Sequence, residues 1–132
     1  MSEAGFHDVS PVFETGLSRE LVLTKAALRA GDNLQLSSKA LAAILGLSEA
    51  TLSRMKAGDY HLRQNQKAYE LAALFVRLYR SLDALVGGDD AVSAQWLRAN
   101  NTALNGMPLE QIQSIAGLIN VITYVDARRA VI

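Results

Sequence analysis

The sequence has no cysteine, few prolines and aromatic residues, and no long apolar run. The absence of cysteine excludes a disulfide scaffold, thiolate zinc sites and cysteine nucleophiles, and it fits a reducing cytoplasm. Two prolines and nine glycines in 132 residues are too few for a linker or a low-complexity protein. No run approaches the roughly 20 apolar residues of a membrane span, and the first residues lack the pattern of a signal peptide. We therefore expect a cytoplasmic protein of one compact domain, or of two very small domains that share a core.

Charge is balanced overall but uneven along the chain, whose formal net charge is zero. Residues 17–80 carry ten Lys/Arg and five Asp/Glu, whereas residues 1–16 carry three acids and no Lys/Arg. Residues 81–132 carry three Lys/Arg and five acids. A basic middle and an acidic second half indicate two surfaces for two different partners, although ordinary scatter in a neutral protein gives the same pattern.

Apolar residues recur at helical spacing through most of the chain, whereas strand-like alternation is weak. The first helix is expected to have Ser18 as its N-cap and Gly31 as its end. Residues 37–57 contain two short helical patterns, and residues 66–86 contain the strongest one. Residues 1–16 show no sustained period and are expected to form an arm.

The second half continues in shorter helical segments. Asp89 or Asp90 can cap a helix that runs to about Ala99, and Pro108 suits the start of another. A last helix is expected over about 116–129. Its inward stripe would be Leu118, Ile119, Ile122 and Val125, with Val121 and Tyr124 outside the stripe. The other expected core residues of this half are Trp96, Leu97, Leu104, Leu109, Ile112 and Ile115. We predict an all-α protein of about six or seven helices.

Residues 38–57 have the spacing of a helix-turn-helix. Such a motif needs a small residue where two helices cross, a residue that tolerates positive φ in the turn, and two apolar anchors on the second helix. Ala42 is the small residue, Gly46 follows it by four, and Leu52 and Met55 are the anchors. Leu41 and Leu45 complete the inward side of the first helix. This segment resembles the helix-turn-helix of the Xre and phage-repressor family.

The resemblance implies that the start of the second helix lies in the major groove of DNA and contacts base edges. The implied base readers are Glu49, Ala50, Ser53 and Arg54, and the implied phosphate contacts are Ser38, Lys39, Thr51 and Lys56. Arg54 suits a guanine and Glu49 suits a cytosine amino group. A plain α-hairpin, or a true motif that does not bind DNA, would give the same pattern.

A second ordered set of residues occupies the rest of the chain. It consists of Trp96–Leu97, Asn100, Leu104, Gly106, Pro108–Leu109, Gly117 in the last helix, and Asp126 and Arg128 near its end. This set resembles the toxin-binding domain of Xre/MbcA/ParS-type antitoxins over roughly residues 68–129, and it follows the helix-turn-helix in the usual order of that family. Two departures are that Ala130 follows Arg129 where the family often has glycine, and that Asn105 separates Leu104 from Gly106.

The resemblance implies a type II antitoxin whose partner is a RES-domain toxin that consumes NAD⁺. The C-terminal region would cover or enter the active-site cleft of that toxin. The implied toxin-binding residues are Tyr124, Asp126, Arg128, Arg129, Val131 and Ile132. Asp126 suits basic groups and Arg128 suits acidic ones, whereas a solvated helix end is the alternative. Repression of its own operon would require a homodimer, because palindromic operators need two-fold symmetric proteins.

Nothing in the sequence indicates catalysis. His7 and His61 are the only histidines, and neither has an acidic partner at ligand spacing. We expect no enzyme activity, no metal and no cofactor. The expected organisation is an arm at 1–16, a helix-turn-helix domain at 17–65, and a toxin-binding and dimerisation domain at 66–132. The alternatives are a stand-alone Xre-type transcriptional regulator and a protein-interaction module with a vestigial helix-turn-helix.

Overall fold

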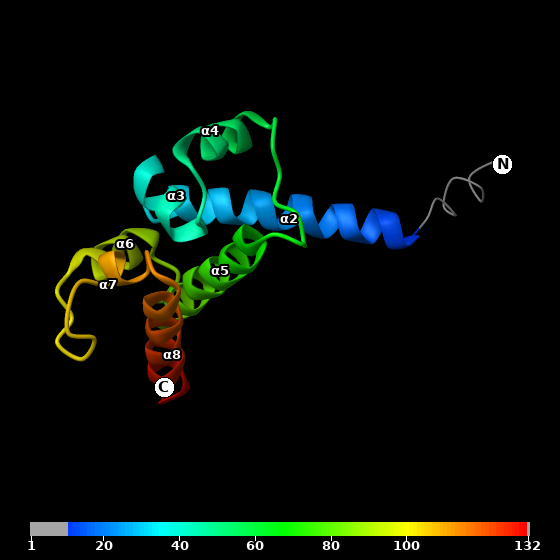
Figure 1. Cartoon of the computed structure of the whole chain (residues 1–132). Coiled ribbons are helices and arrows are strands. Elements are labelled where there is room, and N and C mark those ends of the chain that lie inside the picture. Colours follow the sequence, from blue (N-terminus) through cyan, green and yellow to red (C-terminus); the bar gives the residue numbers. More distant parts are fainter. Residues whose placement is uncertain (1–10, 132) are drawn as a thin grey trace.

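The computed structural model describes the backbone of residues 11–131 and the side chains of residues 16–130, and the described part forms seven helices (Figure 1). They are α2 (Pro11–Asn33), α3 (Ser38–Leu45), α4 (Glu49–Ala57), α5 (Lys67–Leu85), α6 (Asp90–Arg98), α7 (Pro108–Gln111) and α8 (Ile115–Val131). Over the same residues the only β pairing is an isolated bridge between Asn101 and Gly106. The predicted all-α fold is confirmed. None of these helices is both long and apolar enough to span a membrane.

The first helix has different ends from those predicted. Its described part begins at Pro11, seven residues before the predicted N-cap. Ser18 therefore lies inside α2 and is not its N-cap. Gly31 is also internal to α2, which ends at Asn33. Its missing side chain leaves room for Leu41 of α3, since a Cβ on Gly31 would lie 2.7 Å from Leu41 Cδ2. The described part of the predicted arm, residues 11–16, is helical, and residues 1–10 lie outside the described residues.

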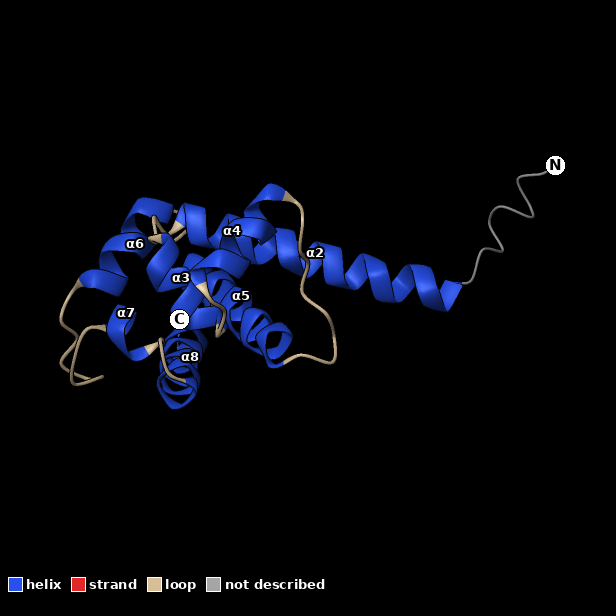
Figure 2. Cartoon of the chain, turned by 45° about the horizontal axis from the view of Figure 1, so that its top comes forward, coloured by secondary structure: helices blue, strands red, loops and turns tan. Residues whose placement is uncertain are grey.

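Helix α5 lies at the centre of the molecule and contacts α2, α3, α6 and α8 (Figures 1 and 2). Its buried residues include Leu71, Phe75, Leu78 and Leu82, which follow the predicted spacing of three and four. Burial of each such side chain contributes roughly 1.5–3 kcal/mol. One helix therefore supports both halves of the chain.

Two polar links join α6 to the end of α2. The Tyr79 hydroxyl donates to Asp90 Oδ1 at 2.7 Å and accepts from Asn33 Nδ2 at 2.9 Å. Burial, together with the bond to Asp90, raises the pKa of Tyr79 above its usual 10.0. The Arg98 guanidinium donates to the backbone carbonyls of residues 34 and 35 at 3.1 and 2.7 Å. These bonds hold α6 against the segment that leads into α3.

The predicted inward stripe of the last helix is partly wrong. The buried residues of α8 are Leu118, Val121, Ile122 and Val125, whereas Ile119 is 48% exposed. Residues 118, 121, 122 and 125 form one face, and residue 119 lies about 100° from residue 118 around the helix. Two overlapping apolar stripes existed in the sequence, and packing against α5 selected the one that contains Val121.

The rest of the predicted core in this half is mostly correct. Leu97, Leu104 and Ile112 are buried, and Leu109 is half-buried. Ile115 was expected inward but is 46% exposed, because it starts α8 on the same side as Ile119. Asp89 caps α6 by accepting from the backbone N–H groups of residues 91 and 92.

Candidate functional site

The turn between α3 and α4 depends on Gly46, as predicted. Gly46 ends α3 in the left-handed region at φ 70° and ψ 32°. Its N–H donates to the Ala43 carbonyl at 3.3 Å, and the N–H of Leu47 donates to the Ala42 carbonyl at 2.9 Å. A Cβ at position 46 would also lie 3.1 Å from Leu71 Cδ1 of α5. The site thus requires both positive φ and a missing side chain, which only glycine provides.

The second helix of the motif, α4, is anchored at both ends of its inner face. Leu52 is fully buried, and Met55 is 2% exposed. Ser48 caps the helix, since its Oγ accepts from the backbone N–H of Thr51 at 3.0 Å. Leu41, Ala42 and Leu45 of α3 are buried as well. The predicted packing of the helix-turn-helix is therefore confirmed.

Near the other end of the chain, three side chains form a layered stack on the surface. The rings of Trp96 in α6 and Tyr124 in α8 are stacked, with centroids 6.3 Å apart and an interplanar angle of 23°. The Arg128 guanidinium lies 5.8 Å from the centroid of the Tyr124 ring. Trp96 packs against the core and stays half-buried. The stack gives this edge of α8 a rigid aromatic surface with a cation on it.

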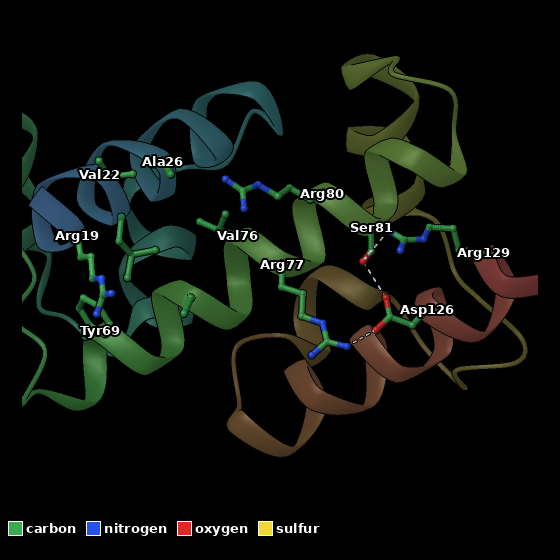
Figure 3. A pocket seen from close by; sticks show the side chains of 12 residues that line it. Arg19, Val22, Ala26, Tyr69, Val76, Arg77, Arg80, Ser81, Asp126 and Arg129 are labelled. Carbon is green, nitrogen blue, oxygen red and sulfur yellow. Dashed lines mark hydrogen bonds and ion pairs between the residues drawn. The ribbon is translucent and has the colours of Figure 1, made fainter. Parts of the chain in front are cut away.

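A carboxylate network occupies a different edge of α8 (Figure 3). Asp126 accepts from Arg77 Nη2 and from Ser81 Oγ, each at 2.7 Å, and Arg129 Nη1 lies 3.4 Å from Ser81 Oγ. The hydrogen bond from Ser81 is the main reason that the pKa of Asp126 lies below its ordinary 3.8; the Arg77 guanidinium adds to this effect, and partial burial opposes it. Asp126 therefore holds α8 against α5 as an ionised carboxylate.

Sequence models of two families match the chain in succession. Residues 16–77 match the antitoxin Xre-like helix-turn-helix domain, and residues 81–130 match the antitoxin Xre/MbcA/ParS C-terminal toxin-binding domain. The chain belongs to the Xre/MbcA/ParS antitoxins. No curated protein matches it. The helix-turn-helix described above is thus the DNA-binding domain of an antitoxin, and α6–α8 belong to its toxin-binding domain.

The predicted base readers of this antitoxin lie together on α4. Glu49, Ala50, Ser53 and Arg54 are all exposed; Ala50, Ser53 and Arg54 lie on the side of the helix away from its buried anchors, and Glu49 lies at the edge of that side. Arg54 is oriented by its own helix, because its Nη2 donates to Thr51 Oγ1 at 3.0 Å. This arrangement is that of a helix that presents its outer face to the major groove of DNA.

The predicted phosphate contacts of the antitoxin are less uniform. Lys39 is exposed, and Lys56 donates from Nζ to Ser38 Oγ at 2.7 Å, which joins the end of α4 to the start of α3. Thr51 is half-buried, and its Oγ1 already accepts from Ser48 and Arg54. Thr51 thus has a structural role within α4, whatever its role toward phosphate.

The predicted toxin contacts of the antitoxin fall on two faces of α8. Tyr124 and Arg128 belong to the aromatic stack, whereas Asp126 lies about 200° from Tyr124 around the helix and bonds to α5. Arg129, about 100° from Arg128, also reaches Ser81 of α5. The side chains of Val131 and Ile132 lie outside the described ones. Ile115 and Ile119, which the sequence analysis placed inside, add two exposed apolar side chains. Their spacing of four on α8 was the signal that could have identified them as a surface pair.

No metal centre accompanies these surfaces among the residues that the structure describes, which contain no group of three or more His, Asp or Glu side chains able to hold an ion. His61 Nε2 faces Glu20 Oε1 at 3.5 Å, in the loop that follows α4. His7 lies outside the described residues.

Proposed function

We propose that this antitoxin binds and blocks a RES-domain, NAD-degrading toxin through its C-terminal helix and tail, and that it represses its own operon. It would act in the cytoplasm as a homodimer without catalysis or cofactor of its own. The observation that carries this proposal is the succession of an Xre-like helix-turn-helix and a toxin-binding domain on one chain. A stand-alone Xre-type regulator remains the alternative, and it would need no toxin.

On the DNA side, Arg54 is proposed to contact a guanine edge and Glu49 a cytosine amino group. Arg54 is exposed and held by Thr51, so little side-chain ordering is required on binding. Arg54→Ala should weaken operator binding by about 1–3 kcal/mol, which is roughly 5- to 150-fold. Lys39→Ala should weaken binding to all sequences and reduce the salt dependence. Arg128→Ala, an exposed arginine on α8, is the matched control and should leave operator affinity unchanged.

On the toxin side, the stacked edge of α8 is proposed as the main contact, and the tail residues Val131 and Ile132, which end the sequence, are proposed as further contacts. Arg128 is exposed and sits over the Tyr124 ring, where it can reach an acidic group of a toxin. Arg129 is proposed as a second contact. Asp126 can reach a toxin only by exchanging its bonds to Arg77 and Ser81, so its substitution should affect toxin binding less than that of Arg128.

The proposal is tested by expressing the product of the neighbouring gene with and without this antitoxin, while growth and cellular NAD⁺ are followed. A fall in NAD⁺ that the antitoxin reverses supports the proposed function. If growth and NAD⁺ stay unchanged, the RES-toxin proposal fails and the stand-alone regulator is favoured.

Two point variants separate the two activities better than a truncation does. Removal of residues 124–132 would also remove Val125, which is fully buried, and would break the Asp126 network. Arg128→Glu should lose protection from the toxin and keep operator binding, whereas Arg54→Ala should do the reverse. The homodimer is tested by light scattering of the purified chain, where a monomeric mass at working concentration would contradict it.

A further inference from the structure

A groove with an apolar floor runs between α2 and α5 and reaches α8 (Figure 3). Two adjoining cavities of about 530 and 350 Å³ form it, and they share Val22, Ala26, Val76 and Arg80. Val22 is 64% exposed, although it is β-branched and apolar. We call this feature the α2–α5 groove. Helix α4 lies on the other side of α2 (Figures 1 and 2), so the groove is separate from the DNA-reading face.

The rim of the groove is strongly basic. Its cations are Arg19, Lys25, Arg29, Arg77, Arg80 and Arg129, and Asp126 is the only acid among the described residues that line it. Within the described part of the chain, the salt bridges are Arg77–Asp126 and His61–Glu20. Five of the six rim cations (Arg19, Lys25, Arg29, Arg80 and Arg129) therefore form no salt bridge there, and Arg129 bonds to the Ser81 hydroxyl instead. A groove of this kind suits an occupant with acidic and apolar side chains.

The segment before α2 has this chemistry. Residues 1–10 carry Glu3 and Asp8 as their acidic side chains, and their apolar residues are Met1, Ala4, Phe6 and Val9. The chain has no Lys or Arg before Arg19. The segment joins α2 at Pro11, and a proline disfavours helical conformation in the residue before it. The chain can therefore leave the helix axis at this point.

The reach of residues 1–10 also matches the distances between these residues along α2. An α-helix advances about 1.5 Å per residue and an extended chain about 3.3 Å. Counted from Pro11, Arg19 lies about 12 Å along α2, Val22 about 17 Å, and the stretch 25–29 about 21–27 Å. If residues 1–10 run back along α2 as an extended chain, Asp8 lies about 10 Å from Pro11, Phe6 about 17 Å and Glu3 about 26 Å. Asp8 thus comes level with Arg19, Phe6 with Val22, and Glu3 with residues 25–29 along α2.

We propose that residues 1–10 fold back along α2 and occupy the α2–α5 groove of the same chain. Asp8 pairs with Arg19, Phe6 covers Val22, and Glu3 lies among the cations of residues 25, 29 and 80. The docked segment neutralises a basic surface that would otherwise attract nucleic acid away from the reading helix. This inference depends neither on the identity of the toxin partner nor on which base pairs α4 reads.

Because the chain has no cysteine, two introduced cysteines can carry spin labels without other changes. Ala4→Cys and Ala73→Cys place one label on the segment and one in the groove of the full-length protein. Pulsed electron–electron distance measurements should give one narrow, short distance at low salt. It should broaden at about 1 M salt, where the Debye length is about 3 Å. A broad distance distribution in the unsubstituted background at low salt would overturn the proposal.

Charge variants in the labelled protein test the pairing itself. Glu3→Lys with Asp8→Lys should lose most of the short-distance population, whereas Asp59→Lys, an exposed acid outside the groove, should keep it. Asp8→Arg should lose it and Arg19→Asp should restore it in the double variant. A short distance that disappears on dilution with unlabelled chain would assign the segment to a second copy and overturn docking within the same chain.

Discussion

Replacing Gly117 by alanine should destabilise this antitoxin, even though alanine is the better helix former. Gly117 lies in the first turn of α8, just after the chain leaves α7. A Cβ at this position would overlap the backbone carbonyl oxygen of Gln111, and it would lie 2.7 Å from the carbonyl carbon and 3.0 Å from Ser114 Oγ. Since a backbone carbonyl cannot rotate away as a side chain can, the connection between α7 and α8 would have to move.

The magnitude follows from two opposing effects. Replacing glycine by alanine inside a helix normally raises the free energy of unfolding by roughly 0.5–1 kcal/mol. Forcing a methyl group into occupied space costs typically about 1–3 kcal/mol, and a backbone obstacle places this site at or above the upper end. The net result should be a loss of about 2 kcal/mol in the free energy of unfolding, or about 8 °C in melting temperature for a chain of this size.

Gly16→Ala is the matched control, because it is the same chemical change in another helix. A Cβ on Gly16 would meet only Gln64 Nε2 at 3.7 Å, which is ordinary contact, so this variant should gain from a few tenths to about 1 kcal/mol. Urea unfolding followed by circular dichroism measures both variants. If Gly117→Ala is as stable as the parent chain, or if both variants change in the same direction, the steric reasoning is refuted.

Three further predictions concern other contacts. Leu52→Ala should cost about 2–5 kcal/mol and abolish operator binding, because the fully buried anchor of α4 is lost; thermal unfolding and a DNA-binding titration check it. Arg98→Ala should cost about 1 kcal/mol in urea unfolding, since the side chain is exposed, and Arg98→Lys should not restore the loss because lysine lacks the fork that spans two carbonyls. Asp126→Asn should flatten the acid dependence of stability. The pKa of Asp126 in the folded protein lies below 3.8, so the ionised carboxylate stabilises the fold above that pH, and this contribution is lost as the pH falls toward the folded pKa. Urea unfolding at several acidic pH values measures the effect, and a pH profile that Asp126→Asn leaves unchanged would contradict the prediction.

The helix-turn-helix was predictable because its constraints are local. Gly46, Leu52 and Met55 fulfil requirements of spacing and φ that arise within twenty residues, so the sequence alone places them correctly. The same holds for α5, whose apolar period is long and unambiguous. The two family matches agree with the order in which these segments occur.

The errors came from features that depend on distant contacts. Gly31 suggests a helix end by type, yet α2 continues to Asn33, and the glycine instead leaves room for the Leu41 side chain of α3. Ile119 and Val121 are both apolar, and only the placement of α5 decides which of them is buried. Helical geometry alone predicts that Tyr124 and Asp126 lie on different faces of α8. The hydrogen bond between Asp126 and Ser81 could not be predicted in this way, because it depends on where α5 lies, 45 residues earlier in the chain.

The shared helix α5 constrains how such a protein can be altered or recombined. The first matched region ends at residue 77 and the second begins at residue 81, so their junction falls within α5, between the buried residues Phe75 and Leu82. Adding one residue there would turn one module against the other by about 100° and shift it by about 1.5 Å. A chimera of two such antitoxins should therefore keep the helical phase across this junction, and the spacing of the two modules is fixed in whole turns rather than by a flexible tether.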